Sequence, residues 1–402
     1  MSNNEGTESP FAARAPAAGY LYQCRYALYE SLRRLRNNPE FAVSVEALDD
    51  VTFEKDGQPI DLLQTKHHLN RTASLTDASP DLWKTIRVWT ETALAGNLLT
   101  GAGLMLVTTA IAPEGSAASY LKPGLTRDVA KAIQRLQSTA ETSTSKDNMP
   151  AYMAFRKLSS EAKKNLFEAS VVIDAQPSIV DLDKELKSLV FYAVERRFLD
   201  SFLNRLEGWW LRRVIKQLVG DAGIILSEEI DAERNLLREQ FKQDNLPVDD
   251  DIMQATVDAS GYQDRVFVHQ LRLIEIGNKR IYFAIRDYFR AFEQRSRWVR
   301  DDLVHVGELG RYEDRLVEEW ERHFERMREE LGAEAVEAAK KEAGRALFAW
   351  IESGDLHTIR ERVRERWVAQ GSYQVLSDKR RVGWHPEFDA RLHELLDSGG
   401  ES

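Results

Sequence analysis

The spacing of apolar residues along the first part of the chain predicts a helix followed by strands. Between Tyr20 and Leu35, apolar side chains recur at steps of three and four, which is the spacing of one helical face. The sequence Asn-Asn-Pro at 37–39 favours an end to that helix. From Phe41 to Val45, apolar residues alternate with small or polar ones, and this alternation is typical of a strand.

A β-hairpin is the simplest structure for the residues that follow. Val51 and Phe53 continue the alternation of the preceding strand. The sequence KDGQP at 55–59 contains an Asp-Gly pair and a proline, both of which favour a turn. We therefore predict that residues 60–66 form a strand that returns beside the first.

Helices and strands alternate through the next hundred residues. Ser79, followed by proline, has the sequence of a helix start, and we expect an apolar strand at 104–110. The polar residues 138–150 predict an exposed loop. We expect a helix at 152–169 and a last short strand at 170–174.

Strand signals nearly vanish after residue 177, and long helical patterns replace them. The apolar spacing predicts helices over roughly 180–218, 266–300 and 311–331. No internal repeat is visible in the sequence.

These patterns predict an α+β protein with two main parts. We expect a flexible lead at 1–18 and a mixed α/β domain at 19–175. A mainly α-helical region would occupy 176–402, and any division within it would fall near residue 250.

Composition indicates the compartment of the protein. The single cysteine, Cys24, excludes an internal disulfide and a zinc site built from several thiolates, and it favours a reducing environment. The first residues carry neither a basic start nor an apolar run, and the apolar stretches are too short to cross a bilayer. We therefore expect a cytoplasmic protein that does not contact a membrane.

The formal charge of −10 is distributed unevenly. Residues 1–170 contain 19 basic and 19 acidic side chains, whereas residues 171–402 contain 36 and 46. A neutral first part is compatible with a phosphate substrate that is bound through a local groove and metal ions. The acidic second part is a poor candidate for the main DNA-binding surface.

The register of the hairpin brings three polar residues together. With the turn near residues 56–57, Asp50 lies beside Leu63 or Gln64. Gln64 and Lys66 share one face because side chains alternate along a strand, and Asp50 joins them if it pairs with Gln64. An acid, an amide and a lysine would then converge.

Such a group suits the hydrolysis of phosphodiesters. That reaction needs a hard cation, and the carboxylate of Asp50, the side-chain oxygen of Gln64 and the backbone carbonyl of Thr65 are candidate ligands for Mg²⁺ or Mn²⁺. The ammonium of Lys66 would orient the attacking water or stabilise the transition state. The remaining candidates for the metal shell are two acids that precede the hairpin, Glu46 and Glu30.

The N-terminal part resembles the PD-(D/E)XK nucleases, and within them the Mrr-like branch of bacterial defence effectors. The resemblance lies in GYLYQ at 19–23, VEALDD at 45–50 and LLQTK at 62–66, and in that branch glutamine commonly replaces the acid of the last motif. It implies a restriction-endonuclease-like fold over about 15–175 and cleavage of DNA. The implied catalytic core is Asp50, Gln64 and Lys66, with Glu46 and Gln23 as weaker additions.

The C-terminal part is similar to C-terminal domains of bacterial ABC-three-component conflict systems. The similarity lies in four segments, at 311–327, 344–352, 370–378 and 382–388. It implies work beside an ABC-type ATPase or another subunit of a system that defends against phage or plasmids, and it implies no catalytic residues.

Simpler interpretations stay open at this point. Asp50 and Lys66 are also compatible with a surface ion pair, and Gln64 in place of an acid removes a ligand charge, which suits a nuclease-like fold without activity. We interpret His67 and His68 as ordinary residues at a strand end.

Aromatic and histidine residues of the second part have structural interpretations. We expect core packing for its tryptophans, among them Trp209, Trp210, Trp298, Trp320 and Trp350. We expect His385 to cap a turn before Pro386.

The sequence thus predicts a magnesium- or manganese-dependent DNA endonuclease, an effector that a partner ATPase controls and that forms an oligomer. The alternative is a catalytically inactive, nuclease-like adaptor that assembles a defence complex.

Overall fold

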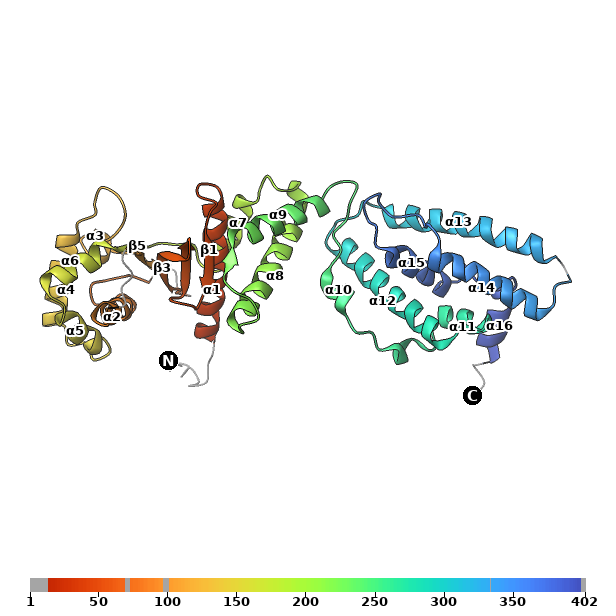
Figure 1. The fold of residues 1–402 in the computed structure, drawn as a ribbon, viewed down its shortest axis with the longest axis horizontal. Coiled ribbons are helices and arrows are strands. Elements are labelled where there is room, and N and C mark those ends of the chain that lie inside the picture. Colours follow the sequence, from red (N-terminus) through yellow and green to blue (C-terminus); the bar gives the residue numbers. More distant parts are fainter. Residues whose placement is uncertain (1–13, 69–72, 97–100, 333, 399–402) are drawn as a thin grey trace, which may run out of the picture. The chain divides into compact units, whose positions relative to one another are not determined.

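The computed structural model describes residues 14–68, 73–96, 101–332 and 334–398. The chain divides into two compact units, Met1–Leu236 and Leu237–Ser402, and each has its own buried core (Figure 1). The first unit extends past residue 175, where we expected the mixed domain to end. It does so because two later helices pack on its first helix and first strand.

A six-stranded mixed sheet lies at the centre of the first unit. In spatial order its strands are β5 (Ser170–Ile173), β4 (Gly103–Thr108), β3 (Gln58–Lys66), β2 (Val51–Lys55), β1 (Ala42–Val45) and β6 (Ile225–Leu226). Strands β3, β4 and β5 run parallel, whereas the other neighbouring pairs are antiparallel. The mixed α+β class that the sequence predicted is confirmed.

The predicted hairpin is formed by β2 and β3. Asp56 and Gly57 have positive φ angles of 52° and 72°, which a two-residue turn of type I′ requires. A bulge between Phe53 and Glu54 then shifts the pairing by one residue. Val51 therefore pairs with Leu63, and the strand pairing ends there, one residue after Asp50.

The helices of the first unit pack on this sheet and on one another. They are α1 (Arg14–Leu35), α2 (Pro80–Leu94), α3 (Ala117–Tyr120), α4 (Val129–Thr142), α5 (Met149–Arg156), α6 (Ser160–Glu168), α7 (Leu182–Leu189), the 3-10 turn η1 (Arg196–Phe198), α8 (Leu199–Leu218) and α9 (Ser227–Gln240). The group from α2 to α6 packs on one face, where Leu62, Leu104 and Trp83 share a core. Helices α1 and α8 lie against β1, and α1 also contacts β3 (Figure 1).

Two predicted boundaries in the first unit differ from the structure. Helix α1 begins at Arg14, so residues 14–18, which we assigned to the flexible lead, are helical; this stretch is rich in alanine and has Pro16 in its first turn. The loop predicted at 138–150 begins only at residue 143, because Ala140 is buried and extends α4 to Thr142.

The helix predicted at 311–331 is confirmed as α13 (Glu308–Leu331), whereas the other long helices that we predicted are interrupted. The predicted helix at 152–169 consists of α5 and α6, and the helix at 180–218 is divided into α7 and α8. The helix at 266–300 is broken where Glu275 adopts a φ of 60° and Gly277 caps the next helix. Strand β6 was missed because two residues are too few to show alternation.

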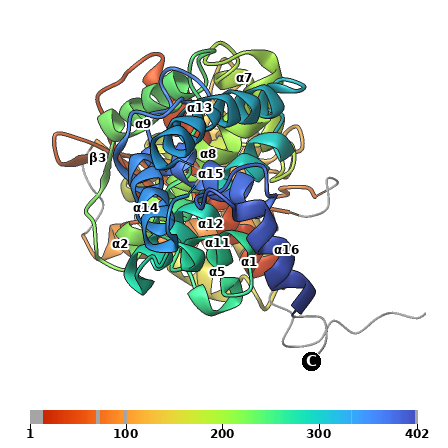
Figure 2. The same cartoon turned by 90° about the vertical axis from the view of Figure 1, so that its right-hand side faces the viewer.

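The second unit is a bundle of helices. They are α10 (Asp250–Gln254), the 3-10 turn η2 (Ala259–Tyr262), α11 (Val266–Leu273), α12 (Asn278–Arg300), α13 (Glu308–Leu331), α14 (Glu337–Ser353), α15 (Arg366–Asp378) and α16 (Phe388–Ser398). Helices α12 and α15 lie side by side (Figures 1 and 2). Their close approach requires Gly371, because a Cβ there would lie 1.9 Å from the carbonyl oxygen of Asp287. None of the described helices is long and apolar enough to cross a membrane.

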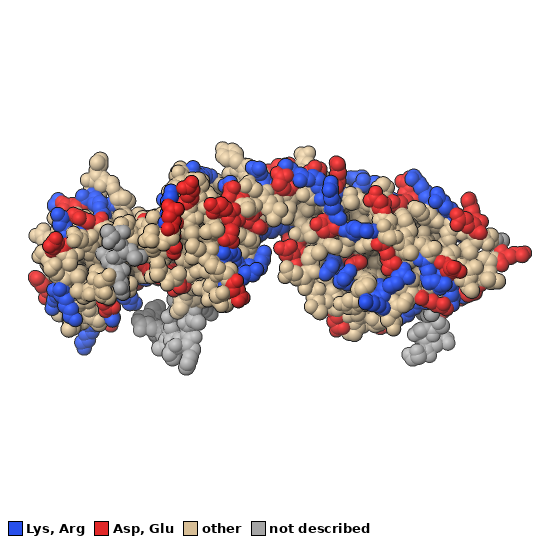
Figure 3. Space-filling model, viewed as in Figure 1, with Lys and Arg blue, Asp and Glu red and all other residues tan. Residues whose placement is uncertain are grey.

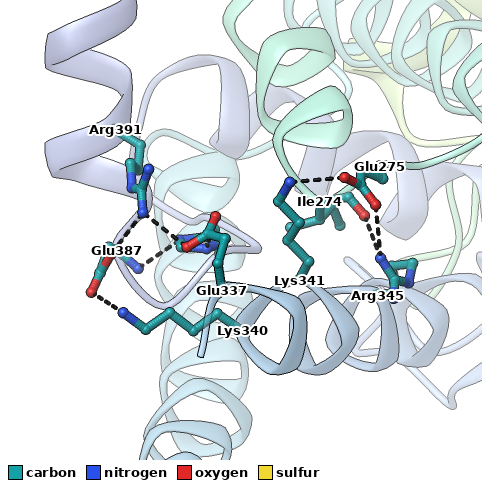
Figure 4. Close-up of polar contacts among 9 residues, drawn as sticks. Ile274, Glu275, Glu337, Lys340, Lys341, Arg345, Glu387 and Arg391 are labelled. Atoms are coloured by element: carbon teal, nitrogen blue, oxygen red, sulfur yellow. Dashed lines mark hydrogen bonds and ion pairs between the residues drawn. The ribbon is translucent and has the colours of Figure 1, made fainter. Parts of the chain in front are cut away.

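A network of charged side chains joins α14 to the loop before α16 (Figure 4). Lys340 lies 2.6 Å from the carboxylate of Glu387, and Arg391 lies 2.9 Å from that of Glu337. His385 is fully buried, and its Nδ1 accepts a hydrogen bond from the backbone N–H of Glu387 at 3.1 Å. The turn that we expected His385 to cap is therefore confirmed.

A buried ion pair inside the second unit predicts a large loss of stability. Arg295 and Glu313 pair with their side chains only 9% and 10% exposed. Replacing Glu313 with Gln leaves the guanidinium without its buried counter-charge, so we expect the free energy of unfolding to fall by about 3 kcal/mol. Urea denaturation of the full chain measures this, with Asp314→Asn as the control because Asp314 is 71% exposed. Equal losses in both variants would contradict it.

The same carboxylate predicts a dependence of stability on acid pH. Burial opposes its ionisation, but the hydrogen bond and charge of Arg295 and the charge of Lys379 outweigh burial and hold the pKa of Glu313 below its ordinary 4.5. The folded state then binds this proton more weakly than the unfolded state, so stability is retained above pH 4.5 and falls as pH drops through the folded pKa. Urea denaturation from pH 6 to pH 3 should show a steeper fall for the parent than for Glu313→Gln.

Candidate active site

The candidate site lies where the hairpin meets the loop between β1 and β2. Glu46 begins this loop with a φ of 55°, and its N–H donates to the carbonyl oxygen of Asp50 at 3.0 Å. The loop 46–50 is thereby closed into a tight turn directly before β2. Its acidic residues face the end of β3, which carries Gln64, Thr65 and Lys66.

Asp50 binds the main chain of β3. Its Oδ2 accepts from the N–H of Thr65 at 2.7 Å and from the Thr65 hydroxyl at 3.1 Å. In a strand, the N–H and the C=O of one residue point to the same side, and the next residue points its own pair to the opposite side. The Lys66 carbonyl accepts from the Thr109 N–H at 3.2 Å, so the backbone groups of Lys66 point toward β4. The carbonyl of Thr65 therefore points to the side of Asp50, as the predicted ligand pair requires.

Gln64 and Lys66 contact each other, and a second acid joins them. Lys66 Nζ donates to Gln64 Oε1 at 3.3 Å, and Gln64 Nε2 donates to Oδ1 of Asp49. Asp50 thus contacts Thr65, while its neighbour Asp49 takes the position opposite Gln64 that we had given to Asp50. The role of Asp49 was not predicted, because alternation along a strand does not extend into the loop before Val51.

The carboxylates of the loop lie close enough to influence one another. Burial, together with the charge of Asp50, raises the pKa of Asp49 from 3.8 to about 6, although Gln64 and Lys66 oppose this rise. Burial and the charge of Asp50 also raise the pKa of Glu46. The charged forms of both carboxyls are therefore disfavoured here, and a bound cation would favour them.

Helix α1 contributes one of the weaker candidates to the site. The side chain of Gln23 lies close enough to Glu46 to lower the pKa of that carboxyl, against the rise that burial causes. The charge of Lys66 acts on Glu46 in the same direction. The structure thus brings Gln23 and Glu46 together beside Lys66.

Glu30 lies in a different group of charges. Its carboxylate pairs with Arg33 at 3.1 Å and with Arg34 at 2.9 Å. Arg34 also binds Asp61 at 2.7 Å and covers the ring of Phe53. The structure therefore places Glu30 in a network that joins α1 to the middle of the hairpin, away from the loop 46–50.

The two histidines after the motif have structural partners. His67 Nε2 accepts from the N–H of Ile179 at 3.2 Å, and its ring lies 4.7 Å from that of Tyr22. His68 Nε2 lies 2.8 Å from the carboxylate of Asp81. Both contacts agree with our interpretation of these histidines as ordinary residues at a strand end.

The donor set at this edge consists of oxygen atoms. Within the described part of the chain, no three or more His, Cys, Asp or Glu side chains are arranged as a metal site. A site here would therefore depend on mixed ligands: the carboxylate of Asp50, the Gln64 side-chain oxygen and the Thr65 carbonyl. Such oxygen ligands suit hard cations such as Mg²⁺ and Mn²⁺.

The second unit has a recognisable counterpart among known families. The segments that suggested it pack together in its core, where Trp320 Nε1 donates to the Gly383 carbonyl at 2.9 Å and the Tyr373 hydroxyl contacts the Leu316 carbonyl at 3.0 Å. Residues 267–392 match C-terminal domain 7 of the ABC-three component (ABC-3C) systems. No curated protein matches the chain.

The match to C-terminal domain 7 includes all four segments that carried the resemblance. Core packing is confirmed for Trp298 and Trp320, which are buried and whose indole N–H groups donate to backbone carbonyls, and for Trp210 of α8. Trp209 and Trp350, for which we also expected core packing, are only half-buried. A domain of a three-component system works with other components, which agrees with the expectation of partner subunits.

Proposed function

We propose that this protein is a metal-dependent DNA endonuclease and the effector of an ABC-three component defence system. The observation that carries the proposal is the convergence of Asp49 and Asp50 with Gln64, Thr65 and Lys66 at one end of the hairpin. An acidic, oxygen-rich edge beside a lysine is what the hydrolysis of a phosphodiester needs.

The residues divide into metal-holding and charge-stabilising groups. Asp50, the Gln64 oxygen and the Thr65 carbonyl would hold Mg²⁺ or Mn²⁺. A bound cation of this kind polarises the phosphate and lowers the pKa of an attacking water. Lys66, 3.3 Å from Gln64 Oε1, is placed to orient the water or to donate to a non-bridging phosphate oxygen as charge develops on it.

Glu46 and Asp49 would support these ligands. Asp49 accepts from the side-chain NH2 of Gln64, and this bond turns the single side-chain oxygen of Gln64 toward Lys66. Glu46 closes the loop through its backbone bond to Asp50 and adds a carboxylate near Gln23.

DNA binding by the chain alone should be weak. Basic and acidic side chains are interspersed on the face shown in Figure 3, and neither sign forms a continuous field there. Because non-specific DNA affinity comes mainly from basic contacts with phosphates, we expect weak binding without a partner. Recruitment through C-terminal domain 7 to an ABC-type ATPase would supply the missing affinity.

An inactive adaptor is the second candidate function. The described residues include no group of three acidic, histidine or cysteine ligands that could hold a metal ion. A weak metal site of this kind favours a protein that does not cleave DNA. In that case the nuclease-like unit would bind DNA or a subunit without cleaving it.

Metal dependence separates the two functions. We expect the full chain, alone or with its ATPase component, to convert supercoiled plasmid to open-circular and linear forms in Mg²⁺ or Mn²⁺. Chelation of the metal by EDTA should abolish this cleavage, because the side chains alone do not activate the attacking water. Intact plasmid under all of these metal conditions would reject the enzyme and favour the adaptor.

A further inference from the structure

A side chain of helix α8 extends the pairing of β1 beyond the short strand β6. Gln217 Oε1 accepts from the N–H of Val45 at 3.3 Å, and its Nε2 donates to the carbonyl of Val45 at 3.0 Å. One side-chain amide thus forms the two bonds that a neighbouring strand would form.

The two hydrogen bonds between Gln217 and Val45 lie on the side of β1 that faces away from β2. Alternate residues of this strand turn their backbone groups away from β2: Phe41 bonds to Ser227, and Val43 pairs with Ile225 of β6. The pairing with β6 stops at Val43. The next residue whose backbone groups face away from β2 is Val45, and Gln217 binds these groups. The amide therefore continues the pairing up to the last residue before the loop.

Val45 directly precedes Glu46, where the chain leaves the strand. Glu46 has a φ of 55° and donates to the Asp50 carbonyl, so its backbone sets the shape of the acidic loop. A non-glycine residue in this conformation costs free energy, and its surroundings must hold it there. Gln217 holds the carbonyl of the peptide between Val45 and Glu46, and Asp50 holds the N–H of the same peptide, so the two bonds together fix the peptide that leads into Glu46.

The same face of α8 also holds helix α1 beside the site. Trp210 Nε1 donates to the carbonyl of Cys24 at 2.7 Å, next to Gln23, and Glu207 pairs with Arg25 at 2.5 Å. Positions 207, 210 and 217 are separated by three and seven residues, which places them on one helical face. One helix thus supports both elements that carry Gln23 and Glu46.

We infer that Gln217 is a positioning residue for the acidic loop 46–50 and hence, if the proposed function holds, for the nuclease site. It lies on α8, beyond the segment 15–175 that resembles the nucleases. The candidate site is therefore completed by a helix that follows that segment in the chain.

Replacing Gln217 with Met tests this inference in the full chain. Methionine keeps the length of the side chain and removes both bonds to Val45. We expect amide hydrogen exchange in residues 44–50 to accelerate about tenfold while the rest of the first unit is unchanged. With Mg²⁺, we expect plasmid cleavage at saturating DNA to slow about tenfold or more with KM for DNA unchanged, because the ligands are misplaced and the DNA contacts are not.

Two further variants control the experiment. Gln134→Met makes the same change on the exposed face of α4 and should match the parent in both readouts. Gln217→Glu keeps an acceptor for the Val45 N–H but cannot donate to its carbonyl, and it serves as the test variant if Gln217→Met does not fold. We expect its effects to be in the same direction and smaller.

The outcomes are distinct. Unchanged exchange in 44–50, or faster exchange with cleavage equal to that of the parent, would overturn the inference. A parent chain that never cleaves DNA would reject the proposed nuclease, and the exchange measurement alone would then decide whether Gln217 positions the loop.

Discussion

Replacing Lys66 with Met is expected to reduce plasmid cleavage by about 100- to 1,000-fold, with little change in thermal stability. Methionine keeps the length of the side chain and removes the ammonium that faces Gln64 at the end of β3. Loss of one preorganised group that stabilises developing charge typically costs a factor of this size. Initial rates on supercoiled plasmid at fixed Mg²⁺ measure the effect.

The matched control for this variant lies on the same hairpin. Lys55 is at the opposite end of β2, where it pairs with the exposed Glu40 at 3.1 Å. Lys55→Met makes the same chemical change away from the site, so its cleavage rate should equal that of the parent. Activity in Lys66→Met within a factor of three of the parent would remove Lys66 from the mechanism.

Asp50→Asn is expected to abolish measurable cleavage and to weaken Mn²⁺ binding at least tenfold. Asparagine can still accept a hydrogen bond from the N–H of Thr65, so the contact with β3 is largely preserved while the ligand charge is lost. A neutral amide is a much poorer ligand for a hard cation than a carboxylate is. Isothermal titration with Mn²⁺ and the plasmid assay together measure both losses.

Asp56→Asn provides the comparison for Asp50→Asn. Asp56 lies in the turn of the same hairpin with a φ of 52°, a conformation that asparagine tolerates well. Cleavage and Mn²⁺ affinity should therefore be those of the parent. If Asp50→Asn bound Mn²⁺ as tightly as Asp56→Asn, the ion would have to bind elsewhere.

The hairpin was predictable because strong local signals define it. Asp-Gly fixes the turn, alternation fixes the faces, and the two together limited the register to two choices, of which a bulge at Phe53 and Glu54 selected one. The roles of the two adjacent acids were not predictable, because their directions depend on the turn that Glu46 begins with a positive φ. No periodic pattern describes such a turn.

Long-range contacts explain the other differences. Nothing in the local sequence indicates that a two-residue strand and Gln217 complete the edge of β1, since these contacts join residues far apart in the chain. The division of the chain at Leu236 and Leu237 follows from the same contacts. In the second unit, by contrast, motif resemblance alone identified the domain that matches residues 267–392.

The most direct test locates the metal and the DNA at once. Crystals of the full chain with a short DNA duplex and Mn²⁺ would show the ion by its anomalous scattering. The proposed nuclease predicts a peak that contacts the Asp50 carboxylate and the Thr65 carbonyl, with a phosphate of the DNA beside it and Lys66. DNA bound to the chain with no ion at Asp50, or with its phosphates away from Lys66, would contradict the assignment of this edge as the active site.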